Sequence, residues 1–195
     1  MRLVVVVVAL CLTTGCATDP EPVRGTPAAA VVPVREIGVL APAEAADTAF
    51  TYDPVAAPPG AELALEVVRG DGTTAVRLSA GMLQPDRGYA AHAHVNPCGR
   101  DDVDAGPHYQ HEVDPAATPE RPSVDPAYAN PHNEVWLELT TDARGNGTAE
   151  TTVPFVFDDR VPSSIVLHEH ATTETEQGRA GSAGGRIACF TAPFR

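Results

Sequence analysis

All seven histidines of this 195-residue chain lie between His92 and His170. Two of them form the triplet His92-Ala93-His94, inside the strand-like stretch of residues 88–95. Because side chains alternate across a strand, both imidazoles would point to one face and the apolar residues beside them to the other. Imidazole nitrogens are common ligands of transition metals, so this pattern predicts a metal-binding pair on a β-sheet.

Further side chains suited to metal, redox or anion chemistry follow the triplet in four segments. In chain order these are Cys98, Gly106-Pro107-His108, Val166-Leu167-His168-Glu169 and Gly184-Gly185-Arg186-Ile187-Ala188-Cys189. A single His-x-His motif is weak evidence for any function. The five motifs in this order, with Arg-x-x-Cys near the end, resemble the copper/zinc superoxide dismutase family, and the resemblance covers residues 35–195.

The resemblance implies a set of ligands and an activity. The implied copper ligands are His92, His94, His108 and His168. Two catalytic residues are implied, since His108 would bridge copper and zinc and Arg186 would guide and orient the superoxide anion. The expected enzyme converts superoxide to dioxygen and hydrogen peroxide by alternating between Cu(II) and Cu(I). The alternative is a dismutase-like protein that binds or buffers copper without fast turnover.

The zinc side of the family's pattern is incomplete in this chain. In the family a second histidine follows the bridging one, and a His-x-x-Asp motif supplies the last two ligands. Here the corresponding segment is His132-Asn133-Glu134-Val135, with valine in the place of aspartate, and His111 lies too close to His108. We therefore expect a copper-only enzyme in which His111 and His132 are loop histidines near the copper ligands. The alternative is a zinc site rebuilt from His108, His111, His132 and an acid such as Glu112, Asp114 or Glu134.

Short strand-like segments separated by turn signals must position these residues. The expected strands include residues 61–69, 73–81, 88–95, 134–141, 148–156, 163–170 and 185–194. The first two flank Gly70-Asp71-Gly72 and predict a hairpin, and the turn at residues 142–147 predicts another. Many short strands without a convincing helix predict an all-β antiparallel sandwich or barrel. The resemblance makes this an eight-stranded Greek-key fold with long metal-binding and active-site loops.

Two long connections carry much of the expected site. Residues 96–133 show little apolar periodicity, and a loop of this length inside a compact domain is usually functional or disordered. Because the segment holds Cys98 and three histidines, we expect a disulfide and a metal to order it. The connection from His168 to Arg186 is shorter than in typical family members, which suggests a more open copper site and weaker steering of superoxide.

The formal net charge of -13 argues against nucleic acid as a partner, because phosphate binding needs a concentrated basic surface. It also repels small anions, so Arg186 should matter more to the capture of superoxide than the field of the whole protein. The expected partners are superoxide, a membrane and, in a homodimer, a second copy of the chain.

The N-terminus has the pattern of an export signal. Arg2 is followed by ten apolar residues, too few to span a bilayer, and then by Leu12-Thr13-Thr14-Gly15-Cys16, which resembles a bacterial lipobox. We expect residues 1–15 to be a lipoprotein-type signal peptide and Cys16 to carry the lipid. The alternative is ordinary cleavage near Ala17 without a lipid.

The rest of the N-terminal region and the cysteines agree with export. Residues 16–34 are rich in proline and alanine and predict a tether, followed by the domain of residues 35–195. Cys11 leaves with the signal and Cys16 carries the lipid, so Cys98 and Cys189 remain to pair in an oxidising compartment, as the family's disulfide also implies. We expect an exported cell-envelope lipoprotein on the outer side of the cytoplasmic membrane, or a periplasmic or secreted protein.

Overall fold

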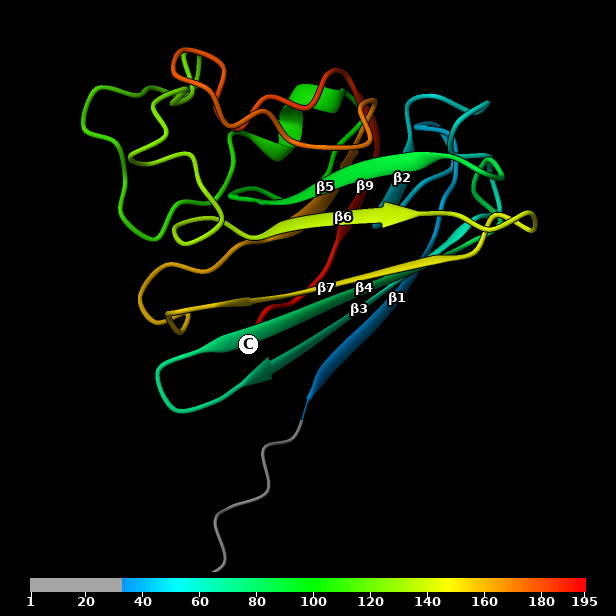
Figure 1. Cartoon of the computed structure of the whole chain (residues 1–195). Helices are drawn as coiled ribbons and strands as arrows, with labels where there is room; N and C mark the ends of the chain where they lie inside the picture. Colours follow the sequence, from blue (N-terminus) through cyan, green and yellow to red (C-terminus); the bar gives the residue numbers. More distant parts are fainter. Residues whose placement is uncertain (1–32) are drawn as a thin grey trace, which may run out of the picture. The chain divides into compact units, whose positions relative to one another are not determined.

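The computed structural model describes residues 33–195, which form nine β-strands (Figure 1). The strands are β1 (Val34–Val39), β2 (Ala49–Thr51), β3 (Glu62–Arg69), β4 (Thr74–Gly81), β5 (Gly88–His94), β6 (Trp136–Thr140), β7 (Gly147–Val153), β8 (Ser164–His168) and β9 (Arg186–Thr191). One 3-10 turn, η1 (Asp102–Ala105), lies between β5 and β6. The predicted signal peptide, Cys16 and nearly all of the predicted tether lie outside the described residues. Among the described residues, no helix is long and apolar enough to cross a membrane.

The strands form two antiparallel sheets that face each other (Figure 1). One has the order β1-β3-β4-β7 and the other the order β2-β9-β8-β5-β6. The chain leaves β4 for β5 in the other sheet and returns after β6 to place β7 beside β4. This crossing is a Greek-key connection, so the predicted all-β antiparallel fold is confirmed. The short strand β2, which pairs with β9, was not foreseen among the eight expected strands.

One of the two predicted hairpins is present and the other is wrong. Strands β3 and β4 pair from Glu62 opposite Gly81 to Arg69 opposite Thr74, as the Gly-Asp-Gly turn indicates. Strands β6 and β7 lie in different sheets, because β6 pairs with β5 and β7 with β4. A turn signal marks a reversal of the chain, but it does not select the neighbour with which each strand pairs.

The hydrophobic core lies between the two sheets, so only one face of β5 points into it. Its buried side chains include Leu63, Leu65, Val67, Val76, Leu78, Tyr89, Ala91, Ala93, Leu137, Leu139, Ile165 and Leu167. On β5, Tyr89 and the two alanines point into this core, and His92 and His94 therefore point to the opposite face of the five-stranded sheet. The predicted alternation of β5 is confirmed.

The outer face of the five-stranded sheet is covered by loops. The connections between β5 and β6 and between β8 and β9 both lie over this face (Figure 1). The two loops are joined by a hydrogen bond of 3.0 Å from the Gly178 amide to the Val124 carbonyl. Because of this cover, His92 and His94 are buried on the side of the sheet away from the core.

Candidate metal centre

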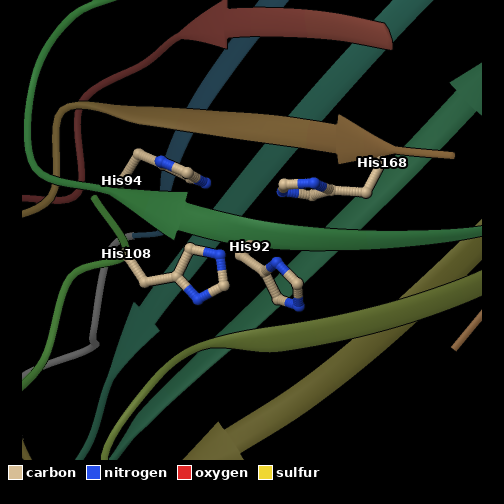
Figure 2. A group of neighbouring side chains, drawn as sticks. All are labelled: His92, His94, His108 and His168. Atoms are coloured by element: carbon tan, nitrogen blue, oxygen red, sulfur yellow. The ribbon is translucent and has the colours of Figure 1, made fainter. Parts of the chain in front are cut away.

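Four of the predicted histidines come together on the loop-covered face of the sheet. His92, His94, His108 and His168 each offer one ring nitrogen, and these four atoms lie within 4.8 Å of one another. Figure 2 shows the four imidazole rings gathered side by side. His92, His94 and His168 are buried, and His108 is partly exposed. We call this group the four-histidine cluster.

The backbone brings the cluster together from three segments. His92 and His94 lie two residues apart on β5. An isolated antiparallel bridge between His94 and His108 brings the long loop alongside the end of β5, and the Tyr109 amide donates to the Ala93 carbonyl at 2.8 Å. His168 ends β8, where the register with β9 shifts. These backbone pairings thus bring together residues that are up to 76 positions apart in the sequence, from His92 to His168.

Three of the four histidines have one ring nitrogen that lacks a partner. His92 Nδ1, His94 Nε2 and His168 Nε2 are buried and make no hydrogen bond. A buried polar atom without a partner costs about 1–3 kcal/mol, and it is otherwise uncommon in native proteins. A metal ion bound by these nitrogens would remove that cost, so the residues present fit a metal.

The other ring nitrogens of these histidines are held by the surrounding chain. His94 Nδ1 donates to the Gly106 carbonyl at 2.9 Å, and His168 Nδ1 lies 3.4 Å from the Gly184 carbonyl. Because a carbonyl only accepts, Nδ1 carries the proton in both rings and Nε2 presents its lone pair to the cluster. His92 is held in the opposite sense, since its Nε2 lies 2.8 Å from the hydroxyl of Thr173.

Thr173 is a functional candidate that the sequence analysis missed. It lies on the loop after β8, is 8% exposed, and its amide donates to Glu138 Oε1 on β6 at 2.8 Å. This bond fixes the backbone of Thr173 so that its hydroxyl meets the ring of His92. No motif in the sequence marks Thr173, because its partner lies 81 residues away.

Burial keeps three histidines of the cluster neutral. Loss of hydration lowers the pKa of His92 and His94 well below 6.5, and the neighbouring histidines add to the effect. Burial and the nearby His108 lower the pKa of His168 to about 3. Neutral imidazole is the form that binds a metal, so these three side chains need lose no proton to do so at neutral pH.

His108 is bonded to a buried carboxylate. Its Nδ1 lies 2.9 Å from Glu134 Oε2, and Glu134 is 2% exposed. The same oxygen accepts from Trp136 Nε1 at 2.7 Å, and Oε1 accepts from Gln110 Nε2 at 2.8 Å. From the sequence, Glu134 was predicted only as one of three candidate acids for a rebuilt zinc site. The register of the sheet explains this contact, because Trp136 lies opposite His92 and Glu134 lies two residues before Trp136.

His111 and His132 lie outside the four-histidine cluster. The His111 ring stacks on Phe155 with 4.3 Å between centroids, and His132 is exposed on its loop. Asp114 accepts from the Ser123 hydroxyl at 2.6 Å. Of the residues predicted for a rebuilt zinc site, His108 and Glu134 are thus the two that contact each other, through a hydrogen bond.

Arg186 begins β9 beside the cluster, where it is the register partner of His168. Its Nη1 donates to the Asp102 carbonyl at 2.8 Å and its Nη2 to the Gly106 carbonyl at 2.6 Å. The Gly106 carbonyl therefore accepts from both Arg186 and His94. Two of the five guanidinium donors are used in this way, and they fix the plane of a group that remains half-buried and cationic.

The predicted disulfide is present. Cys98 and Cys189 are joined with an S–S distance of 2.03 Å and a sequence separation of 91 residues. The bond ties the loop that carries η1 to β9, three residues after Arg186. The loop carbonyls that hold Arg186 are thus anchored to the strand from which Arg186 projects.

Comparison with known proteins supports the fold. The sequence matches no protein-family model and no curated protein. Among solved structures it is similar to the Cu/Zn superoxide dismutase from Brucella abortus, with a TM-score of 0.51 and 20% sequence identity over 75% of this chain and 97% of that one. The described residues therefore have a copper/zinc superoxide dismutase fold, in agreement with the resemblance inferred from the sequence.

Proposed function

We propose that this protein is a copper-dependent superoxide dismutase that protects the cell envelope. The observation that carries the proposal is the four-histidine cluster, with three buried nitrogens that lack hydrogen-bond partners. A similar fold in a Cu/Zn superoxide dismutase supports the same activity. The overall reaction turns two superoxide anions and two protons into dioxygen and hydrogen peroxide.

Copper is the metal that the donor set favours. Four imidazole nitrogens suit copper in both of its oxidation states, and neutral rings can bind it without losing a proton. Bound copper would supply the one-electron couple between Cu(II) and Cu(I) that dismutation requires. The residues proposed to hold it are His92, His94, His108 and His168.

The chain's own part in the reaction is to bind and orient superoxide. Arg186 offers a fixed cation beside the cluster, and its unused N–H groups are proposed to bind the anion. The hydrogen bonds from His92 to Thr173, from His94 to Gly106 and from His108 to Glu134 hold the rings in place. Such contacts keep a ligand set organised before the metal binds.

We further propose that the protein is a copper-only enzyme. The Glu134 carboxylate lies against Nδ1 of His108, the atom through which a bridging histidine would reach a second metal. His111 and His132 lie elsewhere, which leaves few ligands for zinc. Metal analysis after mixed loading tests this proposal: we expect one copper and no tightly held zinc per chain, and one tightly held zinc beside the copper would contradict it.

The location that we propose is the cell envelope, on the outer side of the cytoplasmic membrane, or the periplasm or the medium if the protein carries no lipid. The Cys98–Cys189 disulfide suits an oxidising compartment. Export through residues 1–15 and a lipid on Cys16, giving a membrane anchor, remain proposals that rest on the sequence. Mass spectrometry of the mature N-terminus tests them, because a diacylated Cys16 and an unmodified residue after ordinary cleavage differ in mass.

The decisive experiment loads the purified protein with copper alone and measures superoxide decay by pulse radiolysis. We expect a bound type-2 copper and decay much faster than in buffer. Bound copper with decay no faster than buffer would exclude the enzyme and favour the copper-buffering alternative. His94→Gln should lose the copper, whereas the matched control His111→Gln, outside the cluster, should retain both copper and activity.

A further inference from the structure

A cavity of about 680 Å³ lies between the two long loops and reaches the four-histidine cluster. His108, His168 and Arg186 line one part of it. Superoxide has two atoms, whereas cavities of about 300–1,000 Å³ are typical of sites for organic ligands. Capture of superoxide therefore leaves most of this space unexplained.

Most of the cavity wall is apolar. Its apolar lining includes Val113, Pro119, Pro122, Val124, Ala180 and Ala183. Val113 is 55% exposed and Val124 is 42% exposed, so two of the seven exposed large hydrophobic side chains of the described residues lie on this one wall. Exposed apolar groups gathered in a concave site mark a surface that binds an apolar body.

The wall is held in shape by hydrogen bonds between the two loops and within the longer one. The Gly178 amide donates to the Val124 carbonyl at 3.0 Å, and the turn that carries Pro119 is closed by paired bonds between Thr118 and Arg121 at 3.0 Å. A preformed wall loses little conformational freedom when a ligand binds.

The charged lining of the cavity favours an anion. Arg160 and Arg186 line it together with Glu134, but the carboxylate of Glu134 already accepts from His108, Trp136 and Gln110. Of the two cations, Arg186 is half-buried and Arg160 is exposed. A half-buried cation attracts an anion more strongly than an exposed one, because less water screens it. The part of the cavity that Arg186 lines is therefore cationic, although the chain as a whole has a net charge of -13.

We infer that this cavity binds an organic carboxylate with an apolar, ring-sized body, which lies against Val113 and Val124 with its carboxylate on Arg186. Such a ligand would occupy the approach to the four-histidine cluster. It would therefore compete with small anions for Arg186. The inference concerns a second ligand class and does not depend on the proposed dismutase activity.

The test measures binding of three probes by calorimetry: 2-naphthoate, 2-naphthalenemethanol and acetate. We expect naphthoate to bind at least about tenfold more tightly than the other two, because only naphthoate has both the apolar body and the charge. Equal affinity for naphthoate and its alcohol would overturn the inference, and so would equal affinity for naphthoate and acetate or no binding at all.

Both the metal-free and the copper-loaded protein should bind naphthoate. Binding confined to the copper-loaded form would make the carboxylate a metal ligand and would overturn the inference. The failure of the dismutase proposal would instead appear as slow superoxide decay, which this measurement does not detect.

Variants locate the site. Val113→Ser combined with Val124→Ser should weaken naphthoate binding by about tenfold, and Arg186→Gln should weaken naphthoate but not its alcohol. The matched control is Val55→Ser, since Val55 is 74% exposed and lies outside the cavity lining. If the double valine variant binds like the control, the inference is overturned. Far-ultraviolet circular dichroism of each variant confirms that it is folded.

Discussion

Glu134 Oε2 lies 2.9 Å from His108 Nδ1, which joins a buried carboxylate to the one partly exposed ring of the four-histidine cluster. In this contact His108 Nδ1 is the donor and the carboxylate oxygen the acceptor, which leaves Nε2 as the ring nitrogen that could bind a metal. Trp136 and Gln110 hold the carboxylate from two further sides. Glu134 thus orients a proposed copper ligand without belonging to the ligand set itself.

Replacement of Glu134 by glutamine should weaken copper binding. The amide cannot replace both carboxylate oxygens as an acceptor, so His108 loses its fixed orientation and we expect about a tenfold loss of copper affinity. Competition with a copper chelator measures this change. Glu112→Gln, an exposed acid on the same loop, is the control and should bind copper like the parent protein. Equal affinities in the two variants would show that Glu134 does not position His108.

Thr173 should position His92 through its hydroxyl. Thr173→Val removes the partner of His92 Nε2, and we expect about a tenfold loss of copper affinity and a changed copper EPR spectrum. Thr173→Ser keeps the hydroxyl and should restore both. Thr172→Val, at the exposed neighbouring position, is the control. A serine variant that behaves like the valine variant would contradict the role of the hydroxyl.

Arg186 should govern the rate of superoxide capture. Arg186→Ala removes the cation beside the cluster, so we expect copper-loaded protein to react about tenfold more slowly or worse and with a flatter dependence on salt. Arg186→Lys keeps the charge but loses the forked set of donors, so its rate should lie between those of the parent protein and Arg186→Ala. Pulse radiolysis at low and high salt measures both effects at matched copper content. Unchanged rates would leave Arg186 with only its contacts to Asp102 and Gly106.

The metal-free protein should lose stability in mild acid. Burial lowers the pKa of His168 to about 3, so below its ordinary value near 6.5 the unfolded chain takes up a proton that the folded chain does not. The free energy of unfolding is therefore highest, as far as these histidines are concerned, above about pH 6.5. As the pH falls further, it decreases by up to about 1.4 kcal/mol per pH unit for each such histidine. His92 and His94 shift in the same direction.

Urea unfolding between about pH 6.5 and pH 5 measures this slope, within the window that the lowered pKa values define. His168→Gln should reduce the slope by up to about 1.4 kcal/mol per pH unit, approached toward pH 5, because it removes one proton-linked group. A slope that is the same in the parent and the variant would mean that His168 takes up its proton equally in both states.

Much of the site could be predicted from local patterns in the sequence. The alternation along β5 indicates that His92 and His94 share one face, since side-chain direction in a strand follows from the backbone alone. The order of the other motifs pointed to His108, His168 and Arg186 and to the Cys98–Cys189 disulfide, which the structure contains. The strands that pair with β6 and β7 could not be predicted in this way, because the choice of partner strand depends on how the sheets pack.

The sequence by itself determined the residue types and their local direction: the two-imidazole strand, the Gly-Asp-Gly hairpin and the all-β class. Only the tertiary structure decided which distant groups meet the histidines. Thr173 reaches His92 across 81 positions, and Glu134 reaches His108 across 26. These contacts arise where separate loops fold over one sheet. A local sequence pattern does not predict which loop will cover which strand.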